Sequence, residues 1–299
     1  MAGPPFAAGI LPFYYTAVWD RLQAKPGGGP LAQAAGFRYT ESYITDAGKW
    51  GKEQAMNETL SSFLGVRPGV TALVGAGGKT TAMLTLAEEL AKAGKKVIVT
   101  TTTHMFLPEE QRYGPVFSPE DTAGIAAALE RTGLAVTAGP MDARGKLTGV
   151  SDKQVDNFLT LADYVLAEAD GSRRLPCKTP GEHEPALPAK TGLVVAVLGL
   201  SSLGRPLEEV CFRAELAVRR LETQPDSPLT PEQLARLAAE PWGLAKGSEG
   251  RRFVILLNQS DACDPADLRR VVRAVKETSS ARVVSAALKK KEWKEESIC

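Results

Sequence analysis

Residues 73–81 read Leu73-Val-Gly-Ala-Gly-Gly-Lys-Thr-Thr81, an apolar start followed by glycines and a Gly-Lys-Thr end. Such an end is typical of phosphate-binding loops, in which backbone N–H groups and a lysine surround phosphate oxygens. The standard spacing is G-x-x-x-x-G-K-[ST], but the position that should hold its first glycine is Leu73. The segment is therefore either a nucleotide-binding loop with a shortened turn or a plain glycine-rich connection.

The sequence on either side favours nucleotide binding. Val70–Val74 is a short apolar run, and Ala82–Ala93 has the periodicity of an amphipathic helix, so the glycines connect a strand to a helix. In this setting a lysine reaches the β- and γ-phosphates, and a hydroxyl at the helix start, here that of Thr80, binds Mg²⁺. We expect GTP or ATP to bind with Mg²⁺ through Gly75, Gly77, Gly78, Lys79, Thr80 and Thr81.

The bulk composition is that of an ordinary globular protein. The 299 residues are 43% hydrophobic and 24% charged, and the formal net charge of +1 gives no reason to expect nucleic acid or a membrane surface as a partner. No apolar run reaches the roughly 20 residues of a membrane-spanning helix. A cytoplasmic location is expected because the cysteines are widely spaced and form no C-x-x-C pair; they are Cys177, Cys211, Cys263 and Cys299.

Residues 1–55 differ from the rest of the chain. They contain Pro4-Pro5 and the run Lys25-Pro-Gly-Gly-Gly-Pro30, and they show no clear periodicity. We expect a poorly ordered N-terminal extension over 1–55 and a compact domain over 56–299. The alternative is an N-terminal subdomain with one or two helices.

From Met56 onward, continuous apolar strand runs alternate with helices. This pattern predicts an α/β, three-layer, P-loop NTPase-like fold with a mostly parallel sheet covered on both faces. A capping box at Ser118–Asp121 predicts a helix start there. One helix is expected near Leu207–Arg220, and the last strand near Val283–Ala286. Ligands of such sheets bind at the carboxyl ends of the strands, so the residues after each strand are the candidates.

Two strand ends carry candidate metal-binding groups. Thr100-Thr-Thr-Thr-His104 follows the second strand, where hydroxyls such as that of Thr102 suit Mg²⁺ or a γ-phosphate and His104 suits a partner. The alternative is that β-branched threonines simply end a strand. Glu168 and Asp170 share one side-chain phase after a later strand, so both can face the phosphates and hold Mg²⁺. The candidate catalytic residues are Lys79, Glu168 and Asp170.

The loop 171–185 is rich in charge and stiffened by prolines. It suits a substrate or partner site, and the alternative is a solvated surface loop. The residues that such a site would use are Arg173, Lys178, His183 and Glu184.

Asn258-Gln-Ser-Asp261 follows another apolar strand and resembles the guanine-reading N-K-x-D element of GTPases. Ser285-Ala286 follows one strand later, where GTPases commonly carry a Ser-Ala pair that supports the base. Asn258, Asp261 and Ser285 therefore favour GTP. Gln259 stands in place of the usual lysine, and the alternative is a polar turn before the helix that opens at Pro265.

Together, "LVGAGGKTT", "VIVTTTTHMF", "AEADGSRRLPCKTPGEHEP" and "LLNQSD" resemble the YqeC family, accessory proteins of selenium-dependent molybdenum hydroxylases. The resemblance covers residues 56–299. It implies a P-loop NTPase fold and a role in maturing or loading a selenium-containing molybdenum cofactor. The partner would be a molybdenum hydroxylase or its cofactor, and Glu168-x-x-Gly171 resembles its counterpart in GTPases that assemble metallocentres.

Two other functions stay open at this point. The shortened loop also resembles that of Mur-type ligases, so an ATP-dependent ligase or kinase could act on a small substrate held by Arg173, Lys178 and His183. A nucleotide-binding scaffold without turnover is the third reading. The sequence does not fix the oligomeric state. Homodimers that nucleotides bridge are common among switches of this kind, so a homodimer is one expectation.

Overall fold

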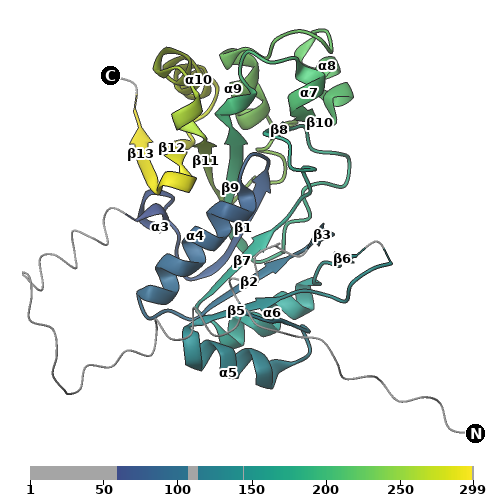
Figure 1. Cartoon of the computed structure of the whole chain (residues 1–299), viewed down its shortest axis with the longest axis vertical. Helices are drawn as coiled ribbons and strands as arrows, with labels where there is room; N and C mark the ends of the chain where they lie inside the picture. The colour runs from purple at the N-terminus through teal and green to yellow at the C-terminus, as the bar shows by residue number, and fades with distance from the viewer. Residues whose placement is uncertain (1–58, 107–113, 144, 298–299) are drawn as a thin grey trace, which may run out of the picture. The chain divides into compact units, whose positions relative to one another are not determined.

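The computed structural model describes residues 59–106, 114–143 and 145–297 (Figure 1). The proposed extension over 1–55, and the start of the domain at residue 56, lie outside these residues. Among the described helices, none combines the length and the apolar character needed to cross a bilayer.

The described residues build a mixed sheet whose strand order is β13-β12-β11-β9-β1-β7-β2-β5-β4. Strand β1 lies between β7 and β9 and pairs in parallel with both. All neighbouring strands are parallel except β12 and β13, so the mostly parallel P-loop NTPase-like sheet is confirmed. The strands are β1 (Gly69–Gly75), β2 (Val97–Thr101), β4 (Val116–Phe117), β5 (Leu134–Thr137), β7 (Tyr164–Glu168), β9 (Thr191–Gly199), β11 (Arg252–Asn258), β12 (Arg282–Ala287) and β13 (Glu292–Glu296).

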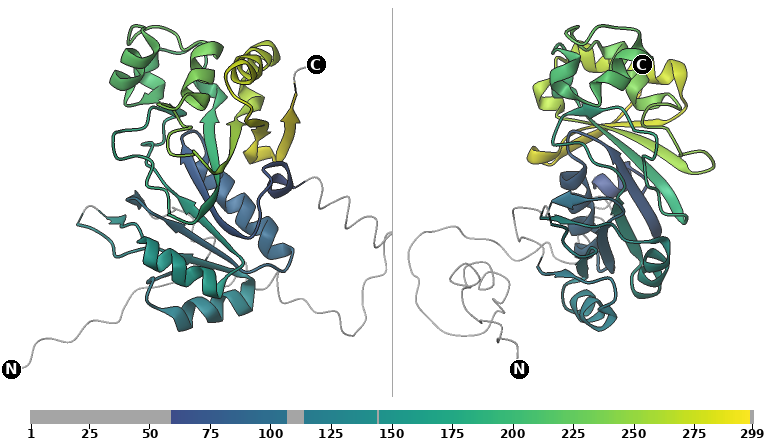
Figure 2. Two further views of the ribbon diagram at one scale, coloured as in Figure 1. Left: turned by 180° about the vertical axis from the view of Figure 1, so that it is seen from behind. Right: turned by 90° about the vertical axis from the view of Figure 1, so that its right-hand side faces the viewer.

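Helices cover both faces of this sheet (Figures 1 and 2). Leu73 of β1 belongs to an apolar cluster with Met83 and Leu86 of α4, whereas Ala72 and Val74 belong to a cluster on the other face. Successive side chains of a strand point to opposite faces, so β1 is buried on both sides. The helices are α3 (Leu60–Phe63), α4 (Lys79–Lys92), α5 (Thr122–Thr132), α6 (Asp152–Leu161), α7 (Leu207–Val210), α8 (Ala214–Leu221), α9 (Pro231–Ala239) and α10 (Pro265–Thr278).

The predicted helix start at Ser118 is wrong by one turn. Helix α5 begins at Thr122, because the carboxylate of Asp121 caps it by accepting from the N–H of Gly124 at 2.9 Å. The side chain of Ser118 instead donates to Glu120. A capping aspartate followed by good helix formers outweighed the upstream Ser-Pro pair.

The single helix predicted over 207–220 is also wrong. Helices α7 and α8 are separated by β10 (Cys211–Phe212), which pairs in parallel with β8 (Cys177–Lys178). Arg213 then takes the left-handed conformation, with φ of 62°, and redirects the chain into α8. This break brings residues 211–215 beside the loop that follows β7.

The strand predicted near Val283–Ala286 is not the last one. Strand β13 follows it and pairs antiparallel with β12 at the edge of the sheet. Its sequence Glu292-Trp-Lys-Glu-Glu296 carries charges that suit an edge strand. Because the segment is mostly charged, its hydrophobicity does not indicate a strand. The remaining short elements are β3 (Met105–Phe106) and β6 (Lys146–Leu147), which pair with each other, and the 3₁₀ turns η1 (Leu200–Ser202), η2 (Ser260–Ala262) and η3 (Leu288–Lys290).

Candidate functional site

The turn between β1 and α4 requires glycine at two positions. A Cβ on Gly77 would lie 2.4 Å from the backbone N of Gly199, and one on Gly78 would lie 2.3 Å from the Nδ2 of Asn258. Both glycines also have positive φ, 75° and 135°. Close packing and backbone conformation together exclude other residues here.

The backbone N–H groups of the turn divide into two sets. The N–H of Gly75 donates to Asp170 at 2.9 Å, and that of Gly77 donates to the carbonyl of Leu175 at 3.1 Å. The N–H groups of residues 78–81 lie at the start of α4, where helix geometry provides no acceptor, and the N-cap Gly78 has no side chain to offer. The N–H groups of residues 78–81, rather than those of Gly75 and Gly77, are therefore the ones that could donate to a ligand oxygen here.

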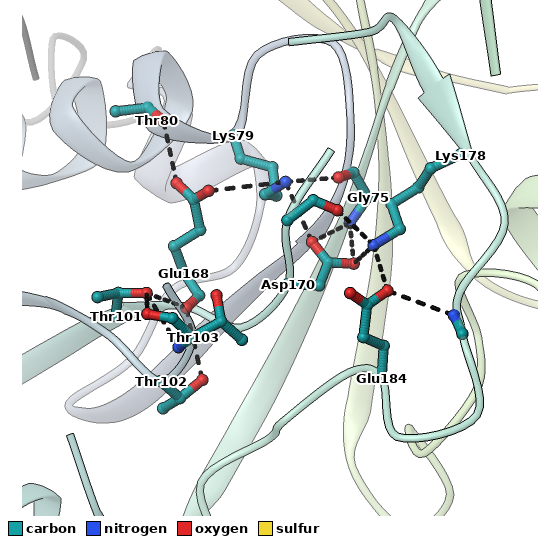
Figure 3. A network of polar contacts seen from close by, with 12 residues as sticks. Gly75, Lys79, Thr80, Thr101, Thr102, Thr103, Glu168, Asp170, Lys178 and Glu184 are labelled. Atoms are coloured by element: carbon teal, nitrogen blue, oxygen red, sulfur yellow. Dashed lines mark hydrogen bonds and ion pairs between the residues drawn. The ribbon is translucent and has the colours of Figure 1, made fainter. Parts of the chain in front are cut away.

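Lys79 lies at the centre of the site, with its side chain 3% exposed. Its Nζ donates to the carbonyl of Gly75 at 2.6 Å and lies 3.1 Å from Oδ1 of Asp170 and 3.7 Å from Oε1 of Glu168 (Figure 3). Burial by itself lowers the pKa of Lys79, but Asp170 and Glu168 outweigh burial and raise that pKa above its ordinary value. Lys79 is therefore charged at neutral pH and is neutralised by the two carboxylates.

Glu168 ends β7 and faces the start of α4. Its Oε2 accepts a hydrogen bond from the hydroxyl of Thr80 at 2.9 Å, and burial raises the pKa of its carboxyl despite the opposing effect of Lys79. Mg²⁺ prefers hard oxygen ligands, and the Thr80 hydroxyl and the Glu168 carboxylate provide two such oxygens beside the N–H groups of residues 78–81. The residues present fit this ion.

Asp170 connects the turn to a second lysine. Its two oxygens accept from the N–H of Gly75, and its Oδ2 lies 3.0 Å from the Nζ of Lys178. As the shared side-chain phase predicts, Asp170 and Glu168 both reach Lys79. The carboxylate of Asp170 thus bridges two buried ammonium groups.

The charged loop 171–185 is not simply a solvated loop. Lys178 has no exposed side-chain surface, and its Nζ donates to Glu184 at 2.7 Å and to the carbonyl of Gly171 at 2.6 Å. Glu184 also accepts from the guanidinium of Arg213. We call Lys79, Glu168, Asp170, Lys178, Glu184 and Arg213 the charged network. His183 and Arg173 of the same loop are exposed instead.

The threonine run after β2 packs on the backbone of Glu168. The hydroxyl of Thr101 donates to the carbonyl of Glu168 at 3.1 Å, and that of Thr102 donates to the carbonyl of Ala186 at 2.6 Å. Thr102 thus sits at the main-chain end of Glu168, whereas Thr80 contacts its carboxylate (Figure 3). The hydroxyl of Thr103 is buried without a hydrogen-bond partner among the described residues.

Asn258 ties the end of β11 to the glycine-rich turn. Its Nδ2 donates to the carbonyl of Gly77 at 2.7 Å, and its Oδ1 accepts from the N–H of Leu288 at 3.2 Å. Asp261 is exposed and pairs with Lys290 at 3.1 Å, and this lysine lowers the pKa of its carboxyl. The hydroxyl of Ser285 donates to Glu296 at 2.6 Å, so Ser285 is occupied by β13.

The structure brings together most of the residues that the sequence singled out. The set gathered around the turn is Gly75, Gly77, Gly78, Lys79, Thr80, Glu168, Asp170, Lys178, Glu184 and Asn258. His104 and His183 are exposed and stand outside this set. Arg213 was missed, because it lies 29 residues beyond Glu184 and no motif surrounds it.

Comparison with known proteins gives one close relationship. The family model of the YqeC protein matches residues 71–215. A protein of Escherichia coli (strain K12), described as "Uncharacterized protein YqeC", is 35% identical over 205 residues, which is 67% of this chain and 79% of the relative.

Two solved structures show only distant likeness. Chloroplast FtsY of Physcomitrella patens is 18% identical with a TM-score of 0.37, and the match covers 78% of this chain and 66% of that one. PAB0955 of Pyrococcus abyssi, a GTPase in apo form, is 16% identical with a TM-score of 0.31, and the match covers 75% of this chain and 92% of that one.

Proposed function

The chain belongs to the YqeC family, and we propose that it is a Mg²⁺-dependent nucleoside triphosphatase that serves as an accessory factor for a selenium-dependent molybdenum hydroxylase. One arrangement carries the enzymatic part of this proposal. The buried Lys79 and the adjacent Thr80 open α4 directly opposite the carboxylates of Glu168 and Asp170. P-loop nucleotidases place a lysine, a metal-binding hydroxyl and a carboxylate around helix-start N–H groups in this way.

Phosphate oxygens would bind the N–H groups of residues 78–81 and the ammonium of Lys79. Bound Mg²⁺ would neutralise charge that develops on the phosphates, held by Thr80 with Glu168 beside it. The protein then contributes mainly positioning and charge stabilisation. Within the threonine run, the hydroxyls of Thr100 and Thr103 are both buried without a hydrogen-bond partner among the described residues. Thr103, which follows the end of β2, would be the one to contact a γ-phosphate or its attacking water.

The charged network supports a switch. A phosphate that approaches Lys79 competes with Asp170 for the same ammonium group. Asp170 is also paired with Lys178, which in turn holds Glu184, and Glu184 holds Arg213. A change in the ion pairs of Lys79 is therefore transmitted to Arg213, the residue that precedes α8. An accessory protein that signals its nucleotide state to a client needs such a connection.

GTP is the favoured nucleotide. The amide of Asn258 fastens the base-reading element to the glycine-rich turn, as a base site next to a phosphate site requires. The pKa of Asp261 is held low, so its carboxylate is an acceptor for the N–H groups of guanine at neutral pH. Gln259, in the position of the usual lysine, accepts from the hydroxyl of Ser201 at 2.6 Å. ATP remains the alternative because of the short turn.

Binding and hydrolysis of GTP and ATP test this proposal. Lys79→Ala should weaken nucleotide binding at least about 10-fold, the loss of one charge-assisted hydrogen bond. Lys92→Ala is the control, because Lys92 is an exposed residue of the same helix. Normal nucleotide binding by Lys79→Ala would refute the phosphate site.

Base preference is tested with a second pair of variants. Asp261→Ala should reduce any preference for GTP over ATP, whereas Asp267→Ala, on the exposed surface of α10, should not. An unchanged preference in Asp261→Ala refutes the base reader and leaves the phosphate site standing. Measurement of product release separates a triphosphatase from a scaffold, which binds nucleotide and liberates no phosphate.

The accessory role needs a cellular readout. In cells that make a selenium-dependent molybdenum hydroxylase, replacement of this protein by its Lys79→Ala variant should lower hydroxylase activity and the selenium content of the purified hydroxylase. The Lys92→Ala variant should restore both. Full hydroxylase activity with Lys79→Ala would remove the proposed role while leaving nucleotide hydrolysis untouched.

A further inference from the structure

A cavity lies at the far end of the charged network. It has a volume of about 440 Å³. Its walls come from the loop after β7, from α7, from β10 and from the first turn of α8. Helices α7 and α8 and strand β10 gather at one end of the sheet (Figure 1). The residues that matter here are Arg173, Arg213, Phe212, Glu208 and Glu215. The glycine-rich turn takes no part in this cavity.

Two guanidinium groups of this cavity stack on one aromatic ring. The guanidinium carbons of Arg173 and Arg213 lie 5.1 Å and 4.5 Å from the ring centre of Phe212. A guanidinium that lies against a ring keeps its N–H groups free at its edge. Arg213 uses that edge for Glu184, whereas Arg173 forms no ion pair or hydrogen bond within the described part of the chain.

The backbone holds both arginines in an unusual conformation. Arg173 has φ of 49° and Arg213 has φ of 62°, in the left-handed region that residues other than glycine seldom adopt. Such conformations cost on the order of 1–3 kcal/mol and persist only where the surrounding structure enforces them. Both cations of the cavity adopt this conformation, as do Arg174, Glu222, Gln259 and Lys291 elsewhere among the described residues.

The carboxylates of the cavity restrict the class of ligand that it can bind. Glu208 and Glu215 line the same space as the two arginines, so the lining is not purely cationic. Two carboxylates repel a polyanion and leave room for a molecule with a single acidic group. The ring of Phe212 adds an apolar surface.

We propose that this cavity binds a small molecule with one oxyanion group, a carboxylate or a phosphate monoester, which the free edge of Arg173 receives beside Phe212. The oxyanion also lies close to Arg213 and competes with Glu184 for it. Because Glu184 is joined through Lys178 and Asp170 to Lys79, occupation of the cavity and of the glycine-rich turn would be coupled. The coupling rests on the proposed nucleotide site, whereas binding in the cavity does not.

Binding is tested on the full chain by nuclear magnetic resonance with two probes that share a ring and differ in the acidic group, benzoate and phenyl phosphate. The Nε–H signals of Arg173 and Arg213 and the amide of Ala214 report on the cavity. The amides of Gly78 and Lys79 report on the glycine-rich turn. A probe that binds only at the turn is thereby recognised.

We expect at least one probe to shift the cavity signals in a saturable way. Arg173→Ala should weaken that binding about 10-fold, whereas Arg219→Ala, an exposed arginine later in α8, should leave it unchanged. The better probe identifies the acidic group. Absence of a saturable shift, shifts confined to Gly78 and Lys79, or equal binding by Arg173→Ala would each overturn the cavity site.

Coupling is measured separately, as nucleotide affinity with and without the better probe. A change of threefold or more that disappears in Arg173→Ala supports it. Unaltered affinity refutes coupling, and a protein that binds the probe but no nucleotide refutes the proposed function while the cavity site stands.

Discussion

Lys178 and Asp170 form an ion pair in which neither side chain has exposed surface, with 3.0 Å between Nζ and Oδ2. Burial of two charges costs several kcal/mol per ion before their attraction is counted. Each member of the pair nevertheless has further partners. Lys178 also contacts Glu184 and the carbonyl of Gly171. Asp170 also contacts Lys79 and the N–H of Gly75. The proposed nucleotide site is thus built on buried charge.

Removal of Lys178 should therefore destabilise the protein strongly. Lys178→Met leaves Asp170 and Glu184 without their shared cation, and the free energy of unfolding should fall by about 3–5 kcal/mol. Lys190→Met is the matched control, since Lys190 pairs with Asp156 on the surface and should cost at most about 1 kcal/mol. Urea denaturation measures both. Equal losses in the two variants would contradict the account of the network.

Gly77 should tolerate no side chain, while Gly171 should. Gly77→Ala places a Cβ 2.4 Å from a backbone atom at positive φ, so a loss of about 2 kcal/mol or more is expected, together with loss of nucleotide binding. A Cβ on Gly171 meets nothing within 4 Å, and Gly171→Ala should stay within about 0.5 kcal/mol. Thermal unfolding and nucleotide titration of both variants decide the matter.

Stability should depend on pH through Glu184. Burial alone raises the pKa of this carboxyl, but hydrogen bonds from Arg213 and Lys178 outweigh it and hold the pKa below its ordinary 4.5. The folded state thus favours the ionised form, which contributes stability above pH 4.5 that is lost as pH falls through the lowered value.

Glu184→Gln is the variant that tests this pH dependence. The stability difference between wild type and Glu184→Gln should be constant near neutral pH and shrink on acidification below about pH 4.5. Glu182→Gln, an exposed change in the same loop, provides the baseline. A difference that grows as the pH falls would reverse the assigned sign.

Thr80 should set the metal requirement. Thr80→Ala removes the hydroxyl that contacts Glu168, and the Mg²⁺ concentration for half-maximal hydrolysis should rise at least about 10-fold. Thr85→Ala, whose hydroxyl only meets the carbonyl of Thr81, should leave that concentration unchanged. Chelation of Mg²⁺ should abolish hydrolysis in every variant. An unaltered Mg²⁺ requirement in Thr80→Ala would remove this residue from the metal site.

The central sheet could be predicted because its strands are continuously apolar. Strand β1 and helix α4 lie where the apolar run 70–74 and the amphipathic run 82–93 predict them, since local pattern and tertiary burial agree there. Prediction failed where tertiary contacts decide the conformation. Arg213 interrupts a helical pattern with a left-handed residue, and β13 is a charged strand that exists because β12 offers it an edge.

The site was predictable to the extent that its residues lie at strand ends. Strands β1 and β7 are neighbours in a parallel sheet, and this pairing brings together Lys79, Thr80, Glu168 and Asp170. The burial of Lys178 could not be foreseen, because a charged proline-rich segment normally reads as solvated. Arg213 had no local signal at all, since its role depends on a partner 29 residues away.

The charged network has one further consequence, which concerns its electrical neutrality. Lys79, Lys178 and Arg213 face Glu168, Asp170 and Glu184, so formal cations and formal anions balance. A triphosphate that bound in the proposed site would therefore meet no surplus positive charge from these six side chains to attract it from a distance. Its counter-charge would have to arrive with it as a metal ion, and the association rate should then vary little with ionic strength.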